Sequence, residues 1–564
     1  MDDADAVKAT IARNMLESGD WVTPRLDGVA YLEKSPLNFW MMAATFRVFG
    51  IHDWAARIPL ALVSVLLCWA VYWWGRWAFG EDAGTYAGLV LSTCVGLYLF
   101  TRIQIPDAMV TLTITATIWA GMRLLEPDEK HPRRWGLLMG VAVGCGLLLK
   151  GFIAVVLPML AAAVYLAVTR EIFSWATWKK LQIPLAGVVA LAVAVPWHWM
   201  ATVRNPPYFV WSFHSGPGEY KGFFWFYFFN EQILRFLNLR YPRDYNTVPR
   251  PLFWILNLAW LFPWSVYLPG TFKLSYRPDT RAGRLRLMAL CWIGVVMVFF
   301  TFSTTQEYYS MPIYPAVALL LGSALAAGGK WVRYGTRALI GLCAVLFVVL
   351  GFLLVQAWPL PAPGDISRAL TQNPDMYTLS MGHMTDLTLG AFAYLKLPLG
   401  VAVAAFGLGA LLLFVWKKST FKSALALSAM MIVFFQASRL ALVRFDPYLG
   451  SYQLANALEK SPPGQLIEAN TYYAFSSVFF YTGRKALLWN GRENNLEYGS
   501  YEPGAPDVFI TDEQFVPLWN SSERCYLLAY GSEMPKVEKL VGRERMIVVR
   551  ENGGNYLLTN QAIE

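Results

Sequence analysis

The sequence has few charged residues. Only 15% of its 564 residues are Asp, Glu, Lys or Arg, whereas soluble domains carry about 25%. The hydrophobic fraction is 56% and the mean hydropathy is +0.39. This deficit excludes an ordinary soluble enzyme and predicts a protein that hides much of its surface from water.

Cysteine and phosphate-binding glycine motifs are also scarce. Of six cysteines, five fall in apolar stretches, and only Cys525 lies in a polar region, so no internal disulfide and no cysteine metal motif is expected. Neither GxGxxG nor GxxxxGK[ST] occurs, and no internal repeat is visible. The sequence therefore requires no nucleotide and no other cofactor.

Long apolar stretches dominate what is present. About 20 apolar residues suffice to cross a bilayer as a helix. We count twelve such stretches: 60–80, 84–101, 108–125, 135–149, 152–168, 182–200, 252–269, 284–303, 310–327, 338–357, 397–416 and 421–441. The chain is thus predicted to be a mostly α-helical, multi-pass membrane protein. The short stretches 135–149 and 152–168 flank Lys150 and Gly151, so they could form one broken hairpin.

The residues responsible for the net charge of +9 are concentrated in particular loops. Lys and Arg gather in alternate loops, at 123–134, 170–180, 273–286, 330–337 and 417–422. Basic loops stay on the cytoplasmic side, so the surplus charge reflects topology and does not indicate a nucleic-acid partner. The outer face then receives residues 1–59, 203–251, 303–311, 358–396 and the tail from about 444.

The tail has a different composition from the rest. From about 444, short apolar runs (QLIEA, KALLW, DVFIT, RCYLLAY, MIVVR) alternate with helix-like stretches. This pattern predicts a small α/β domain. We therefore divide the chain into a membrane domain, 1–443, and a soluble outer domain, 444–564.

The N-terminus, MDDADAVKATIARNMLESGDW, carries Asp2, Asp3 and Asp5 ahead of an amphipathic stretch, 6–18, predicted to lie on the membrane surface. An acidic segment reaches the outer face only if a helix translocates it. We expect a further span upstream, which would make thirteen; the alternative is that the next helix carries the tail across.

Ionisable and aromatic residues recur at the outer ends of the apolar stretches. Such residues are costly at membrane depth and are functional candidates by default. Carboxylates there suit general-base work, cations suit a phosphate, and aromatics suit a sugar or a lipid tail. The alternative is that the cations only snorkel to the interface and the aspartates form a solvated tail. The candidates are Glu33 and Lys34 in YLEKSP, Arg102 and Asp107 in TRIQIPD, Lys150 in LLLKGF, Glu231 and Arg235 in FFNEQILRFL, and Gln306, Glu307, Tyr308 and Tyr309 in TTQEYYS.

A metal site is a weaker expectation. Glu33 and His214, in SFHSGPG, could together hold a divalent ion such as Zn²⁺, Mg²⁺ or Mn²⁺. One His and one Glu far apart in sequence form an incomplete ligand set.

Several of these motifs resemble those of GT-C glycosyltransferases, specifically the aminoarabinose transferase and bacterial protein-mannosyltransferase-like families. The resemblance rests on IARNMLESGDWVTPRLDGVAYLEKSPLNFW, TRIQIPDAMV, GLLLKGFIAVVLP, FFNEQILRFL and FFTFSTTQEYYSMPIYPAVALL, which occur in the family's order over most of residues 1–330. The YTGR and APDVF patterns resemble the periplasmic domain of many members. EKSP and LLLKGF together are fairly specific.

The resemblance implies roles for individual residues. It implies a catalytic base in the first outer loop. Ala4 stands at the family's Asp position, so we assign the base to Asp5, with Asp3 as the second choice. Asp107 matches a further Asp of the family, in a short outer loop. Gln232 replaces the histidine of the family's EH…RF motif, which weakens any metal role there. The donor phosphate is expected to contact Lys34, Lys150, Arg235 and Arg102, and the substrate pocket to include Glu33, Tyr308, Tyr309, Gln306 and Glu231.

The resemblance also implies an activity. Such enzymes move a sugar from a polyprenyl (undecaprenyl) phosphate donor to an outer-face acceptor, here lipid A, another glycolipid or a protein. The chain is then expected to be a monomer in a bacterial inner membrane, with its site and C-terminal domain in the periplasm. A transporter or flippase for a lipid-linked sugar is the alternative, although transporters often show paired repeats.

Overall fold

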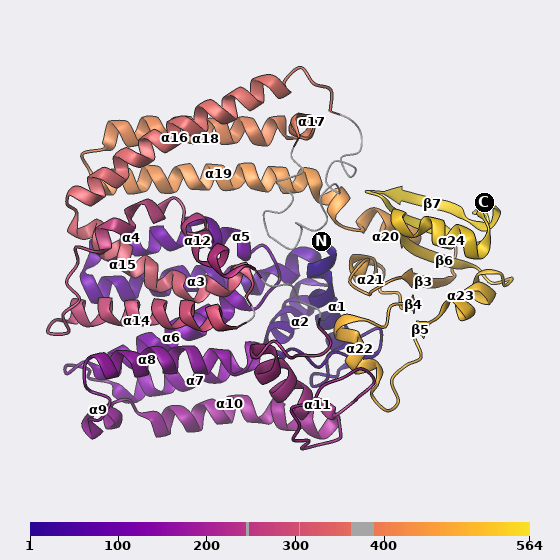
Figure 1. Cartoon of the computed structure of the whole chain (residues 1–564), viewed down its shortest axis with the longest axis horizontal. Helices are drawn as coiled ribbons and strands as arrows, with labels where there is room; N and C mark the ends of the chain where they lie inside the picture. Colours follow the sequence, from indigo (N-terminus) through magenta and orange to yellow (C-terminus); the bar gives the residue numbers. More distant parts are fainter. Residues whose placement is uncertain (244–247, 304, 363–387, 564) are drawn as a thin grey trace.

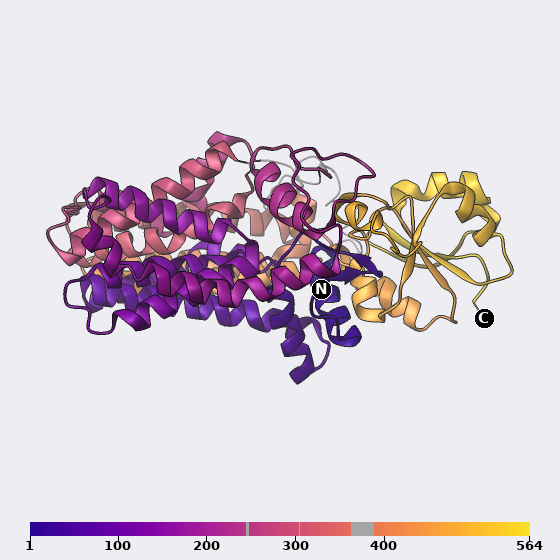
Figure 2. The same ribbon diagram turned by 90° about the horizontal axis from the view of Figure 1, so that it is seen from below.

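The computed structural model describes residues 1–243, 248–303, 305–362 and 388–563. Long helices run side by side along the longest axis of the molecule, and an α/β domain caps one end of them (Figure 1). In the perpendicular view the N-terminus again lies where the two parts meet (Figure 2). The N-terminal acidic cluster is therefore placed at the junction of the two parts.

Long apolar helices form most of the helical part. Within the described ranges, eight are long and apolar enough to cross a membrane, and a ninth span results if the bent pair α12 (Arg250–Trp260) and η2–α13 (Trp264–Thr271) counts as one. The chain is thus a multi-pass membrane protein. The eight are α3 (Asp53–Phe79), α6 (Asp107–Leu125), α10 (Ile183–Arg204), α14 (Arg281–Phe302), η3 with α15 (Glu307–Ala327), α16 (Lys330–Ala357), α17 to α18 (Leu389–Trp416) and α19 (Thr420–Leu449).

The predicted count of twelve spans is not confirmed, because several apolar stretches are short or broken. Stretch 84–101 is split into α4 (Glu81–Ser92) and α5 (Val95–Phe100). Stretches 135–149 and 152–168 correspond to α7 (Pro132–Lys150) and the 16-residue α8 (Ile153–Val168), which pack on each other across a two-residue break. Apolar composition does not reveal where a helix stops.

The N-terminal helix α1 (Asp3–Ser18) has clear end signals. The Asp2 side chain accepts a hydrogen bond from Ala4 N at 3.0 Å, and Gly19 ends the helix in the left-handed region at φ 72°. The apolar side of α1 is buried against α2 (Leu37–Phe49) and α21 (Ser476–Thr482). Its apolar side is therefore covered by protein, and the position of this helix at the membrane surface stays a prediction.

The C-terminal domain contains a six-stranded sheet of order β5-β4-β3-β6-β8-β7. Four strands are parallel, β3 (Gln465–Ala469), β4 (Ala486–Trp489), β5 (Phe509–Ile510) and β6 (Cys525–Tyr530); β7 (Ile547–Asn552) and β8 (Asn555–Thr559) form an antiparallel edge. Each of the five apolar runs quoted above contains a strand. The other helices are α20 (Tyr452–Glu459), α22 (Asn494–Ser500), α23 (Asp512–Trp519) and α24 (Met534–Val541).

The boundary between the two parts and the shorter elements complete the description of the chain. The predicted boundary at 443/444 falls inside α19, whose last residue is Leu449. The predicted outer loop 358–396 lies largely outside the described residues. The remaining elements are β1 (Arg25–Leu26), β2 (Val29–Ala30), α9 (Trp175–Lys180), α11 (Gly222–Phe224), the π-helix η1 (Trp225–Leu234), η7 (Ala393–Leu395), η8 (Gly531–Glu533) and η9 (Arg543–Arg545).

Candidate functional site

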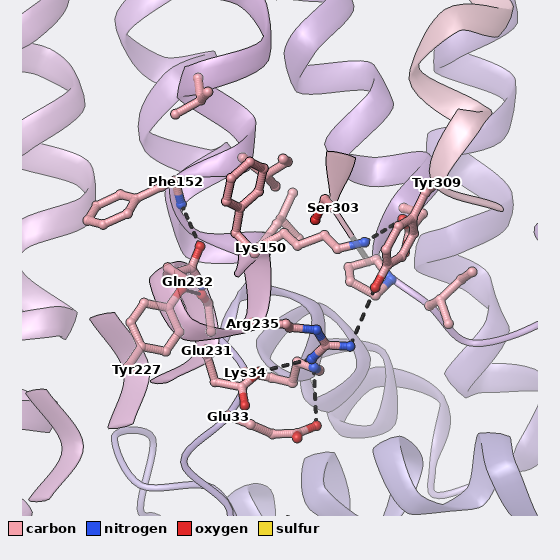
Figure 3. A pocket seen from close by; sticks show the side chains of 18 of the residues that line it. Glu33, Lys34, Lys150, Phe152, Tyr227, Glu231, Gln232, Arg235, Ser303 and Tyr309 are labelled. Carbon is pink, nitrogen blue, oxygen red and sulfur yellow. Dashed lines mark hydrogen bonds and ion pairs between the residues drawn. The ribbon is translucent and has the colours of Figure 1, made fainter. Parts of the chain in front are cut away.

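A cavity of ≈ 480 Å³ lies where several helices of the membrane part end. Its side chains come from segments far apart in the sequence and point into one space (Figure 3). Seven charged residues line it: Lys8, Glu33, Lys34, Asp107, Lys150, Glu231 and Arg235. Together with Tyr308 and Tyr309, these residues show that the structure brings together members of all five outer-end motifs selected by sequence.

Lys150 and Asp107 form the first charged pair of the cavity. Lys150 ends α7 and Asp107 begins α6, and the Lys150 ammonium donates to Asp107 Oδ1 at 2.5 Å. The Lys150 Nζ also lies 4.6 Å from the centre of the Tyr309 ring, a cation–π distance. Asp107 therefore holds the lysine in the cavity wall while leaving its other donors available.

Arg235 forms the second pair, with Glu231 one turn earlier. Its Nη1 donates to Glu231 Oε2 at 3.0 Å, and its Nη2 lies 3.4 Å from the Tyr309 hydroxyl. Glu231 lies on the π-helix η1, whose wider turn lies next to the cavity. Both cations therefore contact Tyr309, Arg235 at its hydroxyl and Lys150 at its ring.

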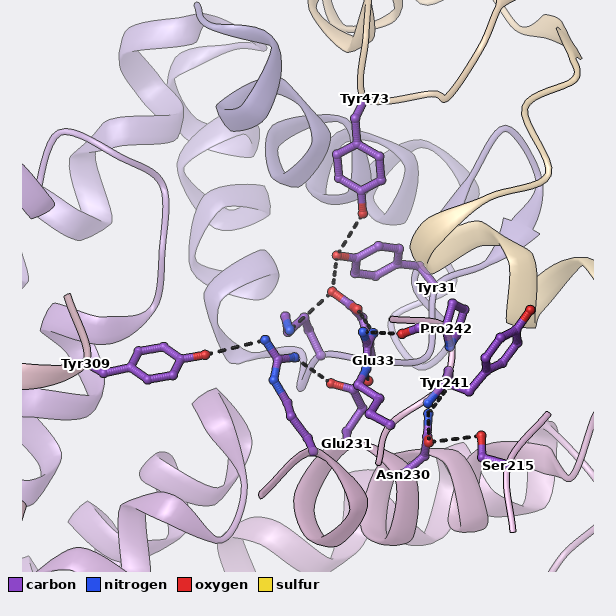
Figure 4. A network of polar contacts seen from close by, with 12 residues as sticks. Tyr31, Glu33, Ser215, Asn230, Glu231, Tyr241, Pro242, Tyr309 and Tyr473 are labelled. Carbon is purple, nitrogen blue, oxygen red and sulfur yellow. Dashed lines mark hydrogen bonds and ion pairs between the residues drawn. The ribbon is translucent and has the colours of Figure 1, made fainter. Parts of the chain in front are cut away.

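Glu33 lies at the centre of a buried polar network (Figure 4). Tyr31 donates to its Oε1 at 2.5 Å, the Lys34 ammonium is 3.2 Å from the same oxygen, and Arg240 donates to Oε2 at 2.9 Å. Burial alone would raise the pKa of Glu33, but the neighbouring cations and this hydrogen bond lower it to about 2. Glu33 is therefore a carboxylate at any physiological pH.

Arg240 joins the two buried carboxylates. Its side chain is fully buried and donates to Glu33, to Glu231 and, at 2.8 Å, to the Pro242 carbonyl. It is absent from the residues lining the cavity. Arg240 therefore acts from behind, holding in place the two carboxylates that orient Lys34 and Arg235.

Gln232 occupies the break between α7 and α8. Its Oε1 accepts from Phe152 N at 3.1 Å. Gly151, at φ 74°, faces this amide so closely that an added Cβ would lie 2.7 Å from Gln232 Nε2. The glutamine at this position therefore caps the interrupted helix pair beside Lys150 (Figure 3).

The rest of the cavity wall is apolar. Aromatic and aliphatic side chains come from the start of α8, from η1 and from the end of α14, and could accommodate a hydrocarbon chain next to the charged groups. They are Phe152, Ile153, Val156, Ile233, Phe236, Phe299 and Phe300.

The acidic cluster does not reach the cavity lining. Asp5 accepts from Arg57 Nη2 and from Gln104 N, both at 2.7 Å. Asp3 accepts from Ser477 N at 2.7 Å and from Ser451 Oγ at 3.0 Å. Both carboxylates are thus held by protein partners. The assignment of the catalytic base to Asp5, with Asp3 as the second choice, stays a prediction.

Two further predicted site residues, Arg102 and Gln306, are also absent from the lining. Arg102 donates to the Tyr98 hydroxyl at 2.7 Å and stacks on that ring. Gln306 caps the start of η3, and only its neighbours Tyr308 and Tyr309 line the cavity.

His214 is exposed, and the structure does not support a metal site with Glu33, because both Glu33 oxygens are taken by Tyr31, Lys34 and Arg240. In the described part of the chain, no group of three or more His, Cys, Asp or Glu could hold a metal ion.

Sequence reasoning missed four residues of the site: Lys8, Tyr31, Arg240 and Tyr473. Tyr473 comes from the C-terminal domain, lines the cavity and donates to the Tyr31 hydroxyl at 3.4 Å. No local sequence pattern identifies these side chains as site residues. Arg240 is a partial exception, because an arginine in an aromatic-rich loop could have been selected as a candidate.

The chain is similar to known proteins in sequence and in fold. The family model described as dolichyl-phosphate-mannose-protein mannosyltransferase matches residues 33–199. An undecaprenyl phosphate-alpha-4-amino-4-deoxy-L-arabinose arabinosyl transferase of Pseudomonas fluorescens (strain Pf0-1) is 29% identical over 386 residues, which cover 66% of this chain and 61% of that protein. A protein of the same description from Pectobacterium atrosepticum is 26% identical, with coverages of 69% and 66%.

Among solved structures, ArnT from Cupriavidus metallidurans bound to undecaprenyl phosphate has a TM-score of 0.78 at 23% identity, covering 99% of this chain and 94% of that one. Its apo state gives a TM-score of 0.76. The alignments with the first two curated relatives span 61% and 64% of their lengths. The chain is similar in sequence to aminoarabinose transferases and has the fold of the solved ArnT structures.

Proposed function

We propose that this protein is a membrane glycosyltransferase that moves a sugar from an undecaprenyl phosphate donor to an acceptor, with 4-amino-4-deoxy-L-arabinose as the sugar and lipid A as the acceptor. One observation carries the proposal: the cavity places paired cations beside an apolar wall. This arrangement suits a phosphate attached to a polyprenyl chain. The names of the relatives support the choice of sugar and carrier.

The charges of the site match a phosphate. With Arg240 behind the wall, five cations face three carboxylates, an excess of two positive charges. A polyprenyl phosphate leaves as a dianion or monoanion, and cations preorganised in a partly closed cavity stabilise that charge as it develops. No activated nucleotide is needed, because the energy of transfer lies in the sugar–phosphate bond.

Each residue of the site has a role in this scheme. Lys34, Lys150 and Arg235 hold the donor phosphate, and Tyr309 lies between the last two. Asp107, Glu33 and Glu231 orient those cations through the ion pairs described above. The bond between the sugar carbon and the phosphate oxygen breaks, the phosphate keeps the electron pair, and an acceptor oxygen forms the new bond.

We also propose that the cavity and the C-terminal domain face the periplasm of a bacterial inner membrane. The basic segment α9 lies at the end of the helical part remote from the C-terminal domain (Figure 1), and basic loops stay cytoplasmic. An alkaline phosphatase fused after residue 563 should be active, and a cytoplasmic reporter there should not. The reverse pattern would contradict this orientation.

The activity is tested on the purified full chain in detergent, where no second compartment exists. Undecaprenyl-phosphate aminoarabinose and lipid A are supplied, and mass spectrometry should show the sugar covalently attached to lipid A. A panel with another glycolipid and a protein acceptor defines the acceptor class. Failure to form any covalent product, together with movement of the lipid-linked sugar across vesicles, would replace the transferase by a flippase.

A further inference from the structure

Lys8 differs from the other cations that line the cavity. Lys34, Lys150 and Arg235 each lie within 3.2 Å of a carboxylate oxygen. For Lys8, the described residues provide neither a hydrogen bond nor an ion pair, although its side chain lines the same cavity and is half-buried. Lys8 is therefore a cation whose partner is not supplied by the described protein.

Such a cation is costly unless an anion meets it. Removing a charge from water is compensated only by an opposite charge or by hydrogen bonds. Burial lowers the pKa of Lys8, while Asp5 and Glu33, too far away for contact, only partly offset this effect. A bound anion would provide the missing compensation.

The charged surroundings of Lys8 differ from those of Tyr309. The neighbours that act on Lys8 are Asp5, Lys34, Glu33 and Asp2. Those that act on Tyr309 include Arg235, Lys150, Asp107 and, again, Lys34. The cations around Tyr309, here called the Lys150 region, thus differ from the charged neighbours of Lys8, which include three carboxylates; Lys34 belongs to both sets.

We propose that Lys8 is a second anion-binding point of the cavity, where its ammonium binds a phosphate or carboxylate oxygen of a substrate. The inference rests on the proposed function for the identity of the substrates. Because the Lys150 region already holds the donor phosphate, Lys8 is placed to recognise an anionic group of the acceptor and so to select acceptors that carry one.

Competitive acetylation of the full chain, read lysine by lysine by mass spectrometry, tests binding without requiring transfer. Three additions are compared: undecaprenol, which has the tail and no phosphate; undecaprenyl phosphate; and undecaprenyl phosphate followed by inorganic phosphate. We expect inorganic phosphate to lower the labelling of Lys8 about fivefold when the site is mostly occupied, with undecaprenol without effect. Exposed Lys539 should label equally throughout.

The outcomes separate the two sources of the anion. Protection of Lys8 that requires inorganic phosphate assigns the point to the acceptor; protection already complete with undecaprenyl phosphate assigns the oxyanion to the donor. Labelling of Lys8 that neither phosphate changes would overturn the proposal, even if transfer fails.

Kinetics give an independent readout. If the wild-type chain transfers sugar, Lys8→Met should raise KM for an anionic acceptor about tenfold to a hundredfold, the value of one hydrogen bond to a charged group. Lys8→Arg should have a KM close to that of the wild type, and Lys539→Met should leave KM unchanged. An active wild type with unchanged KM in Lys8→Met contradicts the inference, whereas an inactive wild type contradicts only the proposed function.

Discussion

The two charged regions singled out by sequence have different surroundings. The cationic region around Lys34, Lys150 and Arg235 converges on one cavity. The acidic region at the N-terminus does not: Asp5 is held by Arg57 and Gln104, and Asp3 by two serines of the C-terminal domain. Both regions break the rule that charge avoids apolar surroundings, yet only one of them lines the cavity.

The comparison teaches how an isolated charge should be interpreted. A buried charge needs a partner of opposite charge or a hydrogen-bonding group, and this partner can belong either to a ligand or to the protein itself. In the cavity each carboxylate pairs with a cation that still faces open space. At the junction the carboxylates bind backbone and side-chain donors that fasten α1 to its neighbours. The free donors beside a pair, rather than the pair itself, distinguish a binding site.

The largest effect is expected from breaking the network at Arg240. Arg240→Met leaves the buried carboxylates of Glu33 and Glu231 without their shared partner, and losing one partner of a buried pair costs about 3–5 kcal/mol. The variant should accumulate poorly and lose its thermal transition in detergent. Exposed Arg243→Met is the matched control. Wild-type stability in Arg240→Met would show that the two carboxylates do not need this arginine.

The next effect concerns the cations that face the cavity. Lys150→Met should reduce transfer about 10²–10³-fold, the usual result of removing one group that stabilises developing charge. Insertion should be unchanged, and thermal stability should fall less than in Arg240→Met, because the variant leaves one buried carboxylate, that of Asp107, without its cation instead of two. Exposed Lys180→Met, at the last residue of α9, should keep full activity. Wild-type turnover in Lys150→Met would mean that this lysine merely snorkels.

A third prediction sharpens the contrast at Asp5. Asp5→Asn weakens a pair in which Arg57 is 40% exposed, so we expect a loss of about 1–2 kcal/mol, less than for a fully buried pair. Arg57→Met should lower the melting temperature by a similar amount, and Glu17→Gln on the same helix should not. If Asp5 is the predicted general base, turnover per folded molecule should fall about 10²–10⁴-fold; a fall of less than about tenfold would leave Asp5 a structural residue only. A 10²-fold loss in a stable Asp5→Asn protein would support the base.

Most of the long helices, the C-terminal strands and two of the cations that line the cavity could be predicted from local sequence. Apolar length predicted the long helices α3, α6 and α16, and the five apolar runs predicted strands of the C-terminal sheet. Lys34 and Lys150 stood out because lysine is rare beside apolar spans.

The remainder depends on tertiary packing. Arg240 meets Glu33 across 207 positions of the chain, and the C-terminal Tyr473 meets Tyr31 across 442. The break between α4 and α5 also escaped detection, because Ser92 and Thr93 are only two polar residues within a long apolar stretch.

The smallest effect tests whether the junction carries a pH dependence opposite to that of the cavity. Asp27 is buried, accepts from Ala486 N at 3.3 Å, and its burial raises the pKa of its carboxyl from 3.8 to about 6. Because the folded state binds this proton more tightly, its contribution to stability is fully present below pH 4 and is lost as the pH rises through 6. Glu33 has the opposite dependence: because its pKa is lowered, its contribution to stability is present above about pH 5 and is lost as the pH falls.

Asp27→Asn keeps an oxygen for the Ala486 amide but cannot ionise. We therefore expect equal melting temperatures for variant and wild type at pH 4, and a variant more stable by about 1–2 °C at pH 8, since one kcal/mol shifts a large chain only slightly. Glu33→Gln, measured alongside, should show a difference from wild type that stays constant from about pH 6 to pH 8 and shrinks as the pH falls below about 5. If wild type and Asp27→Asn keep the same difference at both pH values, the carboxyl of Asp27 does not titrate in this range, and the contrast in pH dependence between the junction and the cavity is lost.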